Sequence, residues 1–144
     1  MMDTMPSMRL QLALNVNDLD AAVEFYSSMF GTEPAKLRPG YANFAIADPP
    51  LKLVLFETDQ ADDSDFQHLN HLGVEVETAA EVTAADQRIG QAGVDTTGVE
   101  DTICCFAEKT ETWVESPEGA RWEWYVKTGD AEQLEHATVP SSCC

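Results

Sequence analysis

LQLALNV at residues 10–16 and NHLGVEV at residues 70–76 repeat one pattern, and this duplication decides the fold. In both stretches apolar residues alternate with other residues at period two, which is typical of a half-buried β-strand. When the two copies are aligned, Gln11 falls on His71. Successive strand residues point to opposite faces. We therefore expect Gln11 and His71 to occupy equivalent places, each opposite the leucines and valines of its strand.

A helix is predicted after each of these strands. The first begins after Asn17 or Asp18 and runs to about Phe30, and the second follows Thr78 and runs to about Ala92. On the first helix, one face is expected to gather Ala21, Ala22, Phe25, Met29 and Phe30.

Strand-like runs broken by Pro and Gly come after each predicted helix. They are residues 41–47 and 51–57 in the first half and residues 103–108, 111–115 and 121–127 in the second. Each half therefore has the order βαβββ, with one strand of the first half weakly marked. We predict an α+β fold in which two βαβββ modules form curved mixed sheets around a cleft.

Composition places limits on the class of protein. We predict one domain over residues 9–127, with modules at about 9–60 and 69–127, and a flexible polar tail over residues 128–144. The net charge of −18 argues against partners that are nucleic acids or anionic membranes. No apolar run approaches membrane-spanning length, and the first residues do not have the pattern of a signal peptide. We expect a cytoplasmic protein.

All four cysteines stand in adjacent pairs, Cys104–Cys105 and Cys143–Cys144. Adjacent α-carbons are about 3.8 Å apart, which is below the usual span of a disulfide. Two adjacent thiolates instead suit a soft metal or metalloid atom, and free thiols favour a reducing compartment. The alternative is that Cys104 and Cys105 pack as small hydrophobic side chains. For the terminal pair, an idle role and a role over the cleft both stay open.

Three polar side chains are candidate metal ligands. Gln11 and His71 are equivalent in the repeat, and Glu123 lies in the run RWEWY (residues 121–125), on the strand face opposite the tryptophans. One imidazole, one carboxylate and one amide oxygen would form a three-ligand site with open positions, as in non-haem Fe(II) oxygenases. Each residue alone has an ordinary alternative: His71 as a satisfied polar side chain, Glu123 as a residue on the solvent side of its strand, and Gln11 as a residue without special notice. His68 belongs to a loop, since residues three apart on a strand face opposite sides.

The duplicated βαβββ pattern resembles the vicinal oxygen chelate superfamily of glyoxalases, extradiol dioxygenases and bleomycin-resistance proteins. Three stretches resemble one subgroup more closely: RPGYANFAIADPPLKLVL at residues 38–55, LNHLGVEV at residues 69–76, and the step Cys104-Cys105-Phe106. That subgroup contains Fe(II)-dependent carbon–arsenic lyases, which act on trivalent organoarsenicals, and the related cadmium-induced proteins.

The resemblance implies roles for particular residues. Gln11, His71 and Glu123 would hold Fe(II), and Cys104 and Cys105 would bind the arsenic of a trivalent organoarsenical, such as methylarsenite or an aromatic arsenical. Dioxygen would then serve cleavage of the carbon–arsenic bond to release arsenite. Phe106, Tyr125 and Trp113 are candidates to wall the substrate pocket, with ordinary core packing as the alternative.

One position distinguishes this activity from that of a glyoxalase. A glyoxalase-type site takes a fourth ligand from the last strand of the first half, where this chain places the apolar Val54. Two alternatives remain, namely a thiol protein that sequesters metals or metalloids without turnover and a drug-sequestering protein. The sequence also leaves open whether the modules pair within one chain or across a homodimer.

Overall fold

The computed structural model describes residues 8–59, 67–104 and 106–130 of the chain. These residues form two compact units, one spanning Arg9–Leu72 and one that begins at Gly73. The element order is βαβββ twice over, as the duplicated sequence predicts. Within the described ranges, no helix is long and apolar enough to cross a membrane.

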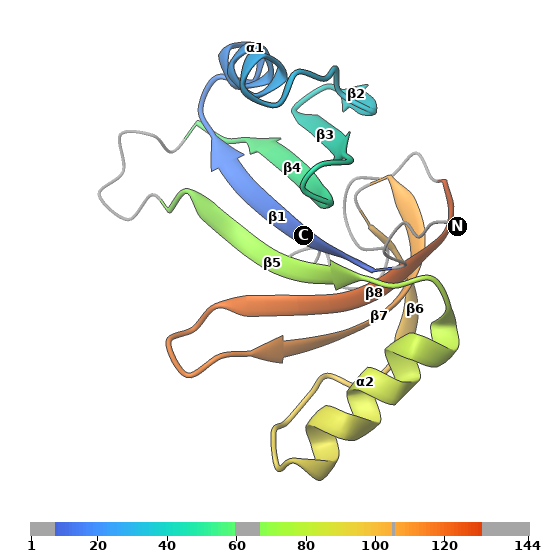
Figure 1. The fold of residues 1–144 in the computed structure, drawn as a ribbon. Helices are drawn as coiled ribbons and strands as arrows, with labels where there is room; N and C mark the ends of the chain where they lie inside the picture. The colour runs from blue at the N-terminus through green and yellow to red at the C-terminus, as the bar shows by residue number, and fades with distance from the viewer. Residues whose placement is uncertain (1–7, 60–66, 105, 131–144) are drawn as a thin grey trace. The chain divides into compact units, whose positions relative to one another are not determined.

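The N-terminal unit, Arg9–Leu72, contains a mixed sheet with one helix against it (Figure 1). Its strands follow the order β2-β3-β4-β1, in which β1 and β4 are parallel and the other pairs are antiparallel. The weakly marked strand is β2, which is only three residues long. The elements are β1 (Arg9–Val16), α1 (Leu19–Phe30), β2 (Lys36–Arg38), β3 (Tyr41–Ile46), β4 (Leu51–Glu57) and the start of β5 (Leu69–Glu75).

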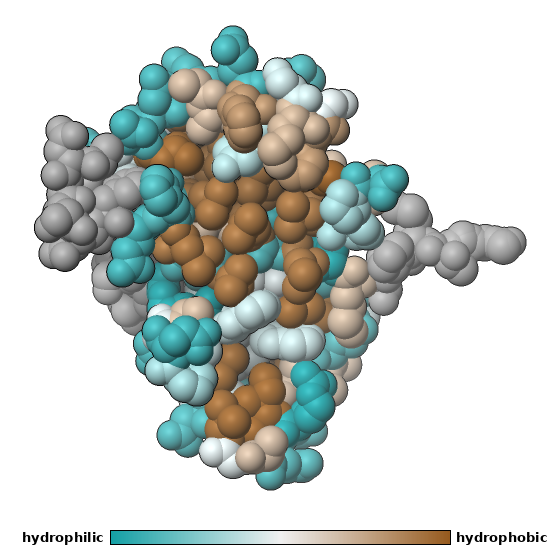
Figure 2. Space-filling model, turned by 60° about the vertical axis from the view of Figure 1, so that its left-hand side comes forward, coloured by the Kyte–Doolittle hydropathy of each residue, from teal (hydrophilic) through white to brown (hydrophobic). Residues whose placement is uncertain are grey.

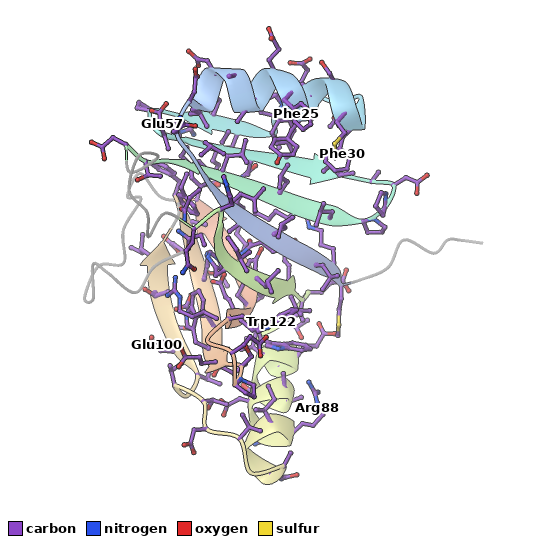
Figure 3. The ribbon with its side chains drawn as sticks, turned by 90° about the vertical axis from the view of Figure 1, so that its left-hand side faces the viewer. Phe25, Phe30, Glu57, Arg88, Glu100 and Trp122 are labelled. Carbon is purple, nitrogen blue, oxygen red and sulfur yellow. The ribbon has the colours of Figure 1, made fainter. Side chains whose placement is uncertain are left out.

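Helix α1 begins and ends at residues whose chemistry explains its bounds. The Asp18 side chain accepts a hydrogen bond from the Ala21 amide at the N-terminus, and Gly31 adopts a left-handed conformation (φ 67°) at the C-terminus. A second carboxylate, Glu57 at the end of β4, accepts from the Leu19 amide at 2.9 Å (Figure 3). Both acceptors satisfy amides that have no partner within the helix.

The face of α1 that packs on the sheet differs from the expected one. The sheet is contacted by residues spaced as i, i+3, i+4, i+7 and i+11, namely Leu19, Ala22, Val23, Tyr26 and Phe30. Phe25 and Met29 are instead 58% and 57% exposed. Most residues of this helix are apolar, so helical spacing alone does not select one face. Figure 2 shows apolar residues, in brown, at the surface among hydrophilic ones in teal.

The two faces of the N-terminal sheet differ in character. One face packs Phe44, Leu53 and Leu55 with α1 in a dry core. The other face carries Gln11 beside Lys52 in register, and both of these polar side chains are buried. The polar strand face predicted from the alternation is therefore withdrawn from water.

The C-terminal unit holds the second helix and three antiparallel strands in the order β8-β7-β6 (Figure 1). A capping box between Thr78 and Glu81 starts α2, and a small core of Val76, Val82 and Val126 lies beneath it. Arg88 of α2, labelled in Figure 3, lies 5.1 Å from the Trp124 ring. The elements are α2 (Ala79–Gln91), β6 (Glu100–Cys104), β7 (Ala107–Glu115) and β8 (Arg121–Asp130).

Two strand boundaries in this unit correct the sequence-based prediction. The run at residues 103–108, predicted as one strand, contains the tight turn between β6 and β7, where Cys104 pairs with Ala107. No Gly, Asn or Asp marks this turn, so its sequence lacks the usual hairpin signal. Strand β8 continues to Asp130, three residues beyond its expected end.

Candidate functional site

Gln11 and His71, which align in the repeat, are in contact within the N-terminal unit. Gln11 lies on β1 and His71 on β5, and they are 2% and 1% exposed. The Nε2 atoms of the two side chains are 3.0 Å apart. The backbone N–H of Asn15 donates to the backbone carbonyl of His68 at 2.7 Å, which holds the start of β5 beside β1. His68 itself precedes β5 and is exposed, as expected.

The other ring nitrogen of His71 is also engaged. Nδ1 lies 2.9 Å from Oδ1 of Asn70. Metal-binding histidines usually donate one ring N–H to a protein acceptor, which orients the ring and leaves the other nitrogen for the metal. The surroundings of His71 match this arrangement.

Glu123 lies in the C-terminal unit, fully buried on β8. Its Oε2 accepts a hydrogen bond from Nζ of Lys109 at 3.0 Å, and Lys109 is 2% exposed. The same ammonium lies 4.8 Å from the centre of the Tyr125 ring. The alternative of a solvent-facing Glu123 is therefore wrong: the carboxylate is withdrawn from water and its charge is compensated by a buried cation.

A second buried carboxyl group lies next to Glu123. Glu111 on β7 is 2% exposed, and its Oε2 accepts from Nε1 of Trp113 at 2.8 Å. Burial, followed by the negative charge of Glu123, raises the pKa of Glu111 to about 8. Glu111 thus favours its neutral form at neutral pH.

The predicted substrate-binding residues fall partly outside the described structure. Cys105, Cys143 and Cys144 lie outside the described residues, as does the side chain of Cys104. The backbone places Cys104 at the end of β6, directly before the turn to β7. Phe106, in that turn, is 8% exposed and has φ 61°, a conformation that is strained for a bulky side chain.

The other aromatic candidates lie on the β7–β8 pair. Tyr125 is fully buried, and Trp113 stands opposite Glu123 in the strand register. Trp113 and Arg121, whose guanidinium carbon is 5.1 Å from the Trp113 ring, help line a pocket of about 860 Å³ within the C-terminal unit. Trp113 therefore walls a pocket, whereas Tyr125 packs beneath the Lys109 ammonium.

The donor groups in each unit fit a divalent metal. A neutral imidazole and an amide oxygen are suitable ligands for Fe(II) and the other divalent transition metals. A buried carboxylate adds a negative charge that compensates the charge of the metal. Among the residues that the structure describes, three His, Cys, Asp or Glu side chains do not gather into a metal-binding group. The fit thus rests on the Gln11–His71 pair and, separately, on Glu123.

The position of a fourth ligand carries no donor. Val54 is 2% exposed and lies between Ala13 and Asn43 in the register of the N-terminal sheet. An apolar side chain there cannot bind a metal.

Sequence reasoning missed four buried or partly buried polar residues around these candidates, Lys109, Glu111, Asn15 and Asn70. Lys109 and Glu111 precede Trp113 at period two, and this alternation in the sequence indicates one strand face. Asn15 and Asn70 lie within the repeated strands β1 and β5 and carried no comparable signal.

Comparisons with known proteins agree with this fold. Residues 9–124 match the glyoxalase/bleomycin resistance protein/dioxygenase superfamily. The chain belongs to this superfamily.

The chain is similar in sequence to two relatives and in fold to one solved structure. A trivalent organoarsenical cleaving enzyme of Thermomonospora curvata is 53% identical over 136 residues, covering 94% of this chain and 87% of the relative. A cadmium-induced protein of Mycobacterium tuberculosis is 53% identical over 124 residues, covering 86% and 79%. The Mn(II)-bound glyoxalase of Novosphingobium aromaticivorans is 19% identical with a TM-score of 0.60, covering 89% of this chain and 42% of that chain. This last likeness concerns the fold.

Proposed function

We propose that this protein is a carbon–arsenic lyase that cleaves trivalent organoarsenicals to arsenite, using Fe(II) and dioxygen. The observation that carries the proposal is the 53% identity to an enzyme named for cleaving trivalent organoarsenicals. The buried pairing of Gln11 with His71 supports a metal-dependent activity, because a burial this complete places both side chains away from bulk water.

In this proposal Gln11, His71 and Glu123 are the metal ligands. When bound, Fe(II) would supply activation of dioxygen for cleavage of the carbon–arsenic bond. His71 offers Nε2, because its Nδ1 faces Asn70. Gln11 offers its amide oxygen, and Glu123 offers a carboxylate that Lys109 otherwise neutralises. Two neutral ligands and one anionic ligand leave positions for substrate and dioxygen.

Cys104 and Cys105 are proposed to hold the substrate. As thiolates they would displace two hydroxides from R–As(OH)₂, which leave as water after taking up two protons, and two As–S bonds form. This attachment fixes the arsenic-bound carbon in one place, and positioning of this kind accounts for a large part of a rate enhancement. The thiolate is the attacking form, so the rate of substrate capture should rise as pH rises toward the thiol pKa, although the net exchange of thiols for arsenic-bound hydroxides takes up no proton.

Phe106, in the strained turn beside the cysteines, and Trp113, in the wall of the pocket, are proposed to contact the organic group. Aromatic walls suit an aromatic substituent on arsenic. Their surfaces would also keep water from the reacting carbon.

The test is anaerobic reconstitution with Fe(II), addition of methylarsenite, exposure to air and measurement of inorganic arsenite. We expect arsenite release that depends on both iron and oxygen and is lost in Glu123→Ala and Cys104→Ser. Glu118→Ala in an exposed turn serves as the matched control and should retain release.

A sequestration protein is the second candidate, favoured by the equal identity to a cadmium-induced protein. It predicts stoichiometric binding of Cd(II) or arsenical to the thiols without arsenite release. Under that function Cys104→Ser would abolish binding, and Glu123→Ala would leave binding intact. No oxygen-dependent release from the wild-type protein would overturn the lyase proposal.

A further inference from the structure

A chain of side-chain hydrogen bonds leads from the backbone to His71 within the N-terminal unit. It runs from the Gln67 carbonyl through Asn15 and Asn70 to His71, and ends at Gln11. The four donor–acceptor distances are 2.9, 3.0, 2.9 and 3.0 Å in that order. Three of these links join residues far apart in the sequence, because Gln11 and Asn15 lie on β1 whereas Gln67, Asn70 and His71 lie on or just before β5. The fourth link joins the adjacent residues Asn70 and His71.

The direction of every bond in this chain follows from its first member. A backbone carbonyl oxygen accepts hydrogen bonds and cannot donate one. Asn15 must therefore present Nδ2 to the Gln67 carbonyl, and its Oδ1 then faces Asn70. Asn70 must in turn present Nδ2 to Asn15, which directs its own Oδ1 at the His71 ring.

The tautomer of His71 is fixed by the same reasoning. Nδ1 must carry the proton in order to donate to Oδ1 of Asn70. A neutral imidazole has one protonated nitrogen, so Nε2 is left with its lone pair. That lone pair accepts from Nε2 of Gln11 at 3.0 Å. Both ends of this hydrogen-bond chain, the Gln67 carbonyl and the Gln11 amide, therefore assign the same tautomer to His71.

We propose that Asn15 and Asn70 are positioning residues that hold His71 as the Nδ1–H tautomer. Nε2 then stays unprotonated as the atom that would bind the proposed metal, once the Gln11 amide, which now donates to it, turns its oxygen toward the metal. The inference rests on the proposed ligand role of His71. A ring that already presents the correct nitrogen does not have to change tautomer or rotate when the metal binds. Partners of this type typically account for a 10- to 100-fold difference in metal affinity.

Burial protects the hydrogen bonds of the His71 ring from exchange with water. His71 is 1% exposed and Gln11 is 2% exposed, so bulk water does not readily replace either partner of the ring. Asparagine is suited to this task because its side-chain amide donates through Nδ2 and accepts through Oδ1. The carbonyl at the start of the hydrogen-bond chain therefore determines which atom of each asparagine faces the next residue and, at the end, which nitrogen of the ring is protonated. A leucine of similar size would interrupt that transfer without opening a large cavity.

The first measurement is nitrogen NMR of the histidine rings in metal-free protein, above the pH at which imidazoles lose their charge. The His71 signals are identified by their loss in His71→Gln. We expect a protonated Nδ1 and an unprotonated Nε2 in the wild type. Asn70→Leu and Asn15→Leu should move the population toward the Nε2–H form, whereas Asn17→Leu, in an exposed neighbouring position, should not. A wild-type ring protonated at Nε2, or an Asn70→Leu ring that stays protonated at Nδ1, overturns the proposal.

The second measurement is Mn(II) affinity by competition with a chromophoric chelator. Asn70→Leu should weaken binding about 10- to 100-fold. Asn70→Asp, which keeps an acceptor for Nδ1–H, should recover most of the loss, and Asn17→Leu should match the wild type. Unchanged affinity in a folded Asn70→Leu variant with an altered tautomer would refute the link between tautomer and metal. If Asn70→Leu does not fold, Asn15→Leu and Asn70→Asp decide the matter by the same two readouts.

These readouts separate the inference from the proposed function. Failure of the lyase assay with the expected tautomer and metal affinity would leave the positioning role standing. A wild-type protein with the expected tautomer whose affinity for Mn(II) does not change in His71→Gln would instead refute the ligand role, and with it this inference.

Discussion

Replacing Lys109 by methionine should destabilise the protein strongly. The substitution removes the ammonium that lies 3.0 Å from Oε2 of Glu123, in a place where both side chains are at most 2% exposed. Removing one partner of a buried ion pair leaves an uncompensated charge and costs about 3–5 kcal/mol. For a chain near 150 residues, each kcal/mol lowers Tm by about 2–4 °C, so a fall of about 6–20 °C follows.

The double variant Lys109→Met/Glu123→Gln distinguishes this cause from lost packing. It removes both charges, so it should recover most of the stability lost by Lys109→Met alone. Thermal and urea unfolding of metal-free protein at pH 7 provide the measurement, and Lys127→Met, at a partly exposed ion pair with Asp130, is the matched control. A loss below about 1 kcal/mol for Lys109→Met, or a double variant no better than the single one, would refute the reasoning.

Three further outcomes follow from the described contacts. Glu111 has a pKa raised to about 8, so between about pH 5 and 8 the folded protein holds a proton that the unfolded chain releases. The free energy of unfolding should therefore fall as pH rises from about 5 to 8, and urea titrations should show a flatter slope for Glu111→Gln. Thr78→Ala removes the acceptor for the Glu81 amide and should cost about 1 kcal/mol by urea unfolding, whereas Thr83→Ala, inside the helix, should not. Gly31→Ala meets no atom within 4 Å, so its loss of about 1–2 kcal/mol in the same assay should come from the left-handed backbone alone.

Periodicity predicted much of the fold because it reports on local geometry. The alternation in β1 and β5 identified both strands, and the capping residues Asp18 and Thr78 located both helices. The predicted contact face of α1 was right for Ala22 and Phe30 but wrong for Phe25 and Met29, because apolar residues occupy most of the helix surface and the sheet contacts only some of them. The β6–β7 turn was missed because Phe106 occupies a backbone conformation that usually signals glycine or asparagine.

In the candidate site, too, some residues could be predicted from the sequence and others depend on the tertiary fold. Repeat alignment predicted that Gln11 and His71 would be equivalent, and the structure places them in contact. No repeat relates Lys109 or Glu111 to Glu123, so their meeting depends on the antiparallel pairing of β7 with β8 and not on local sequence. The asparagine chain depends on the fold to an even greater degree, because the loop carbonyl of Gln67 sets the direction of its bonds.

The buried polar groups of the C-terminal unit argue for a function, since stability alone would not select them. Glu111 keeps an oxygen that has no hydrogen-bond partner within the described structure, and its neighbours Lys109 and Glu123 both give up hydration. Replacing a buried ion pair by apolar side chains of similar volume is often neutral or stabilising by about 1–4 kcal/mol.

The triple variant Lys109→Met/Glu111→Met/Glu123→Met should accordingly be as stable as the wild type or more so, while losing arsenite release. A triple variant that folds but is much less stable than the wild type would show that these groups serve the fold. Retained release would show that Glu123 takes no part in the chemistry. Greater stability together with lost activity is the result expected of polar groups kept for chemistry at a cost to the fold.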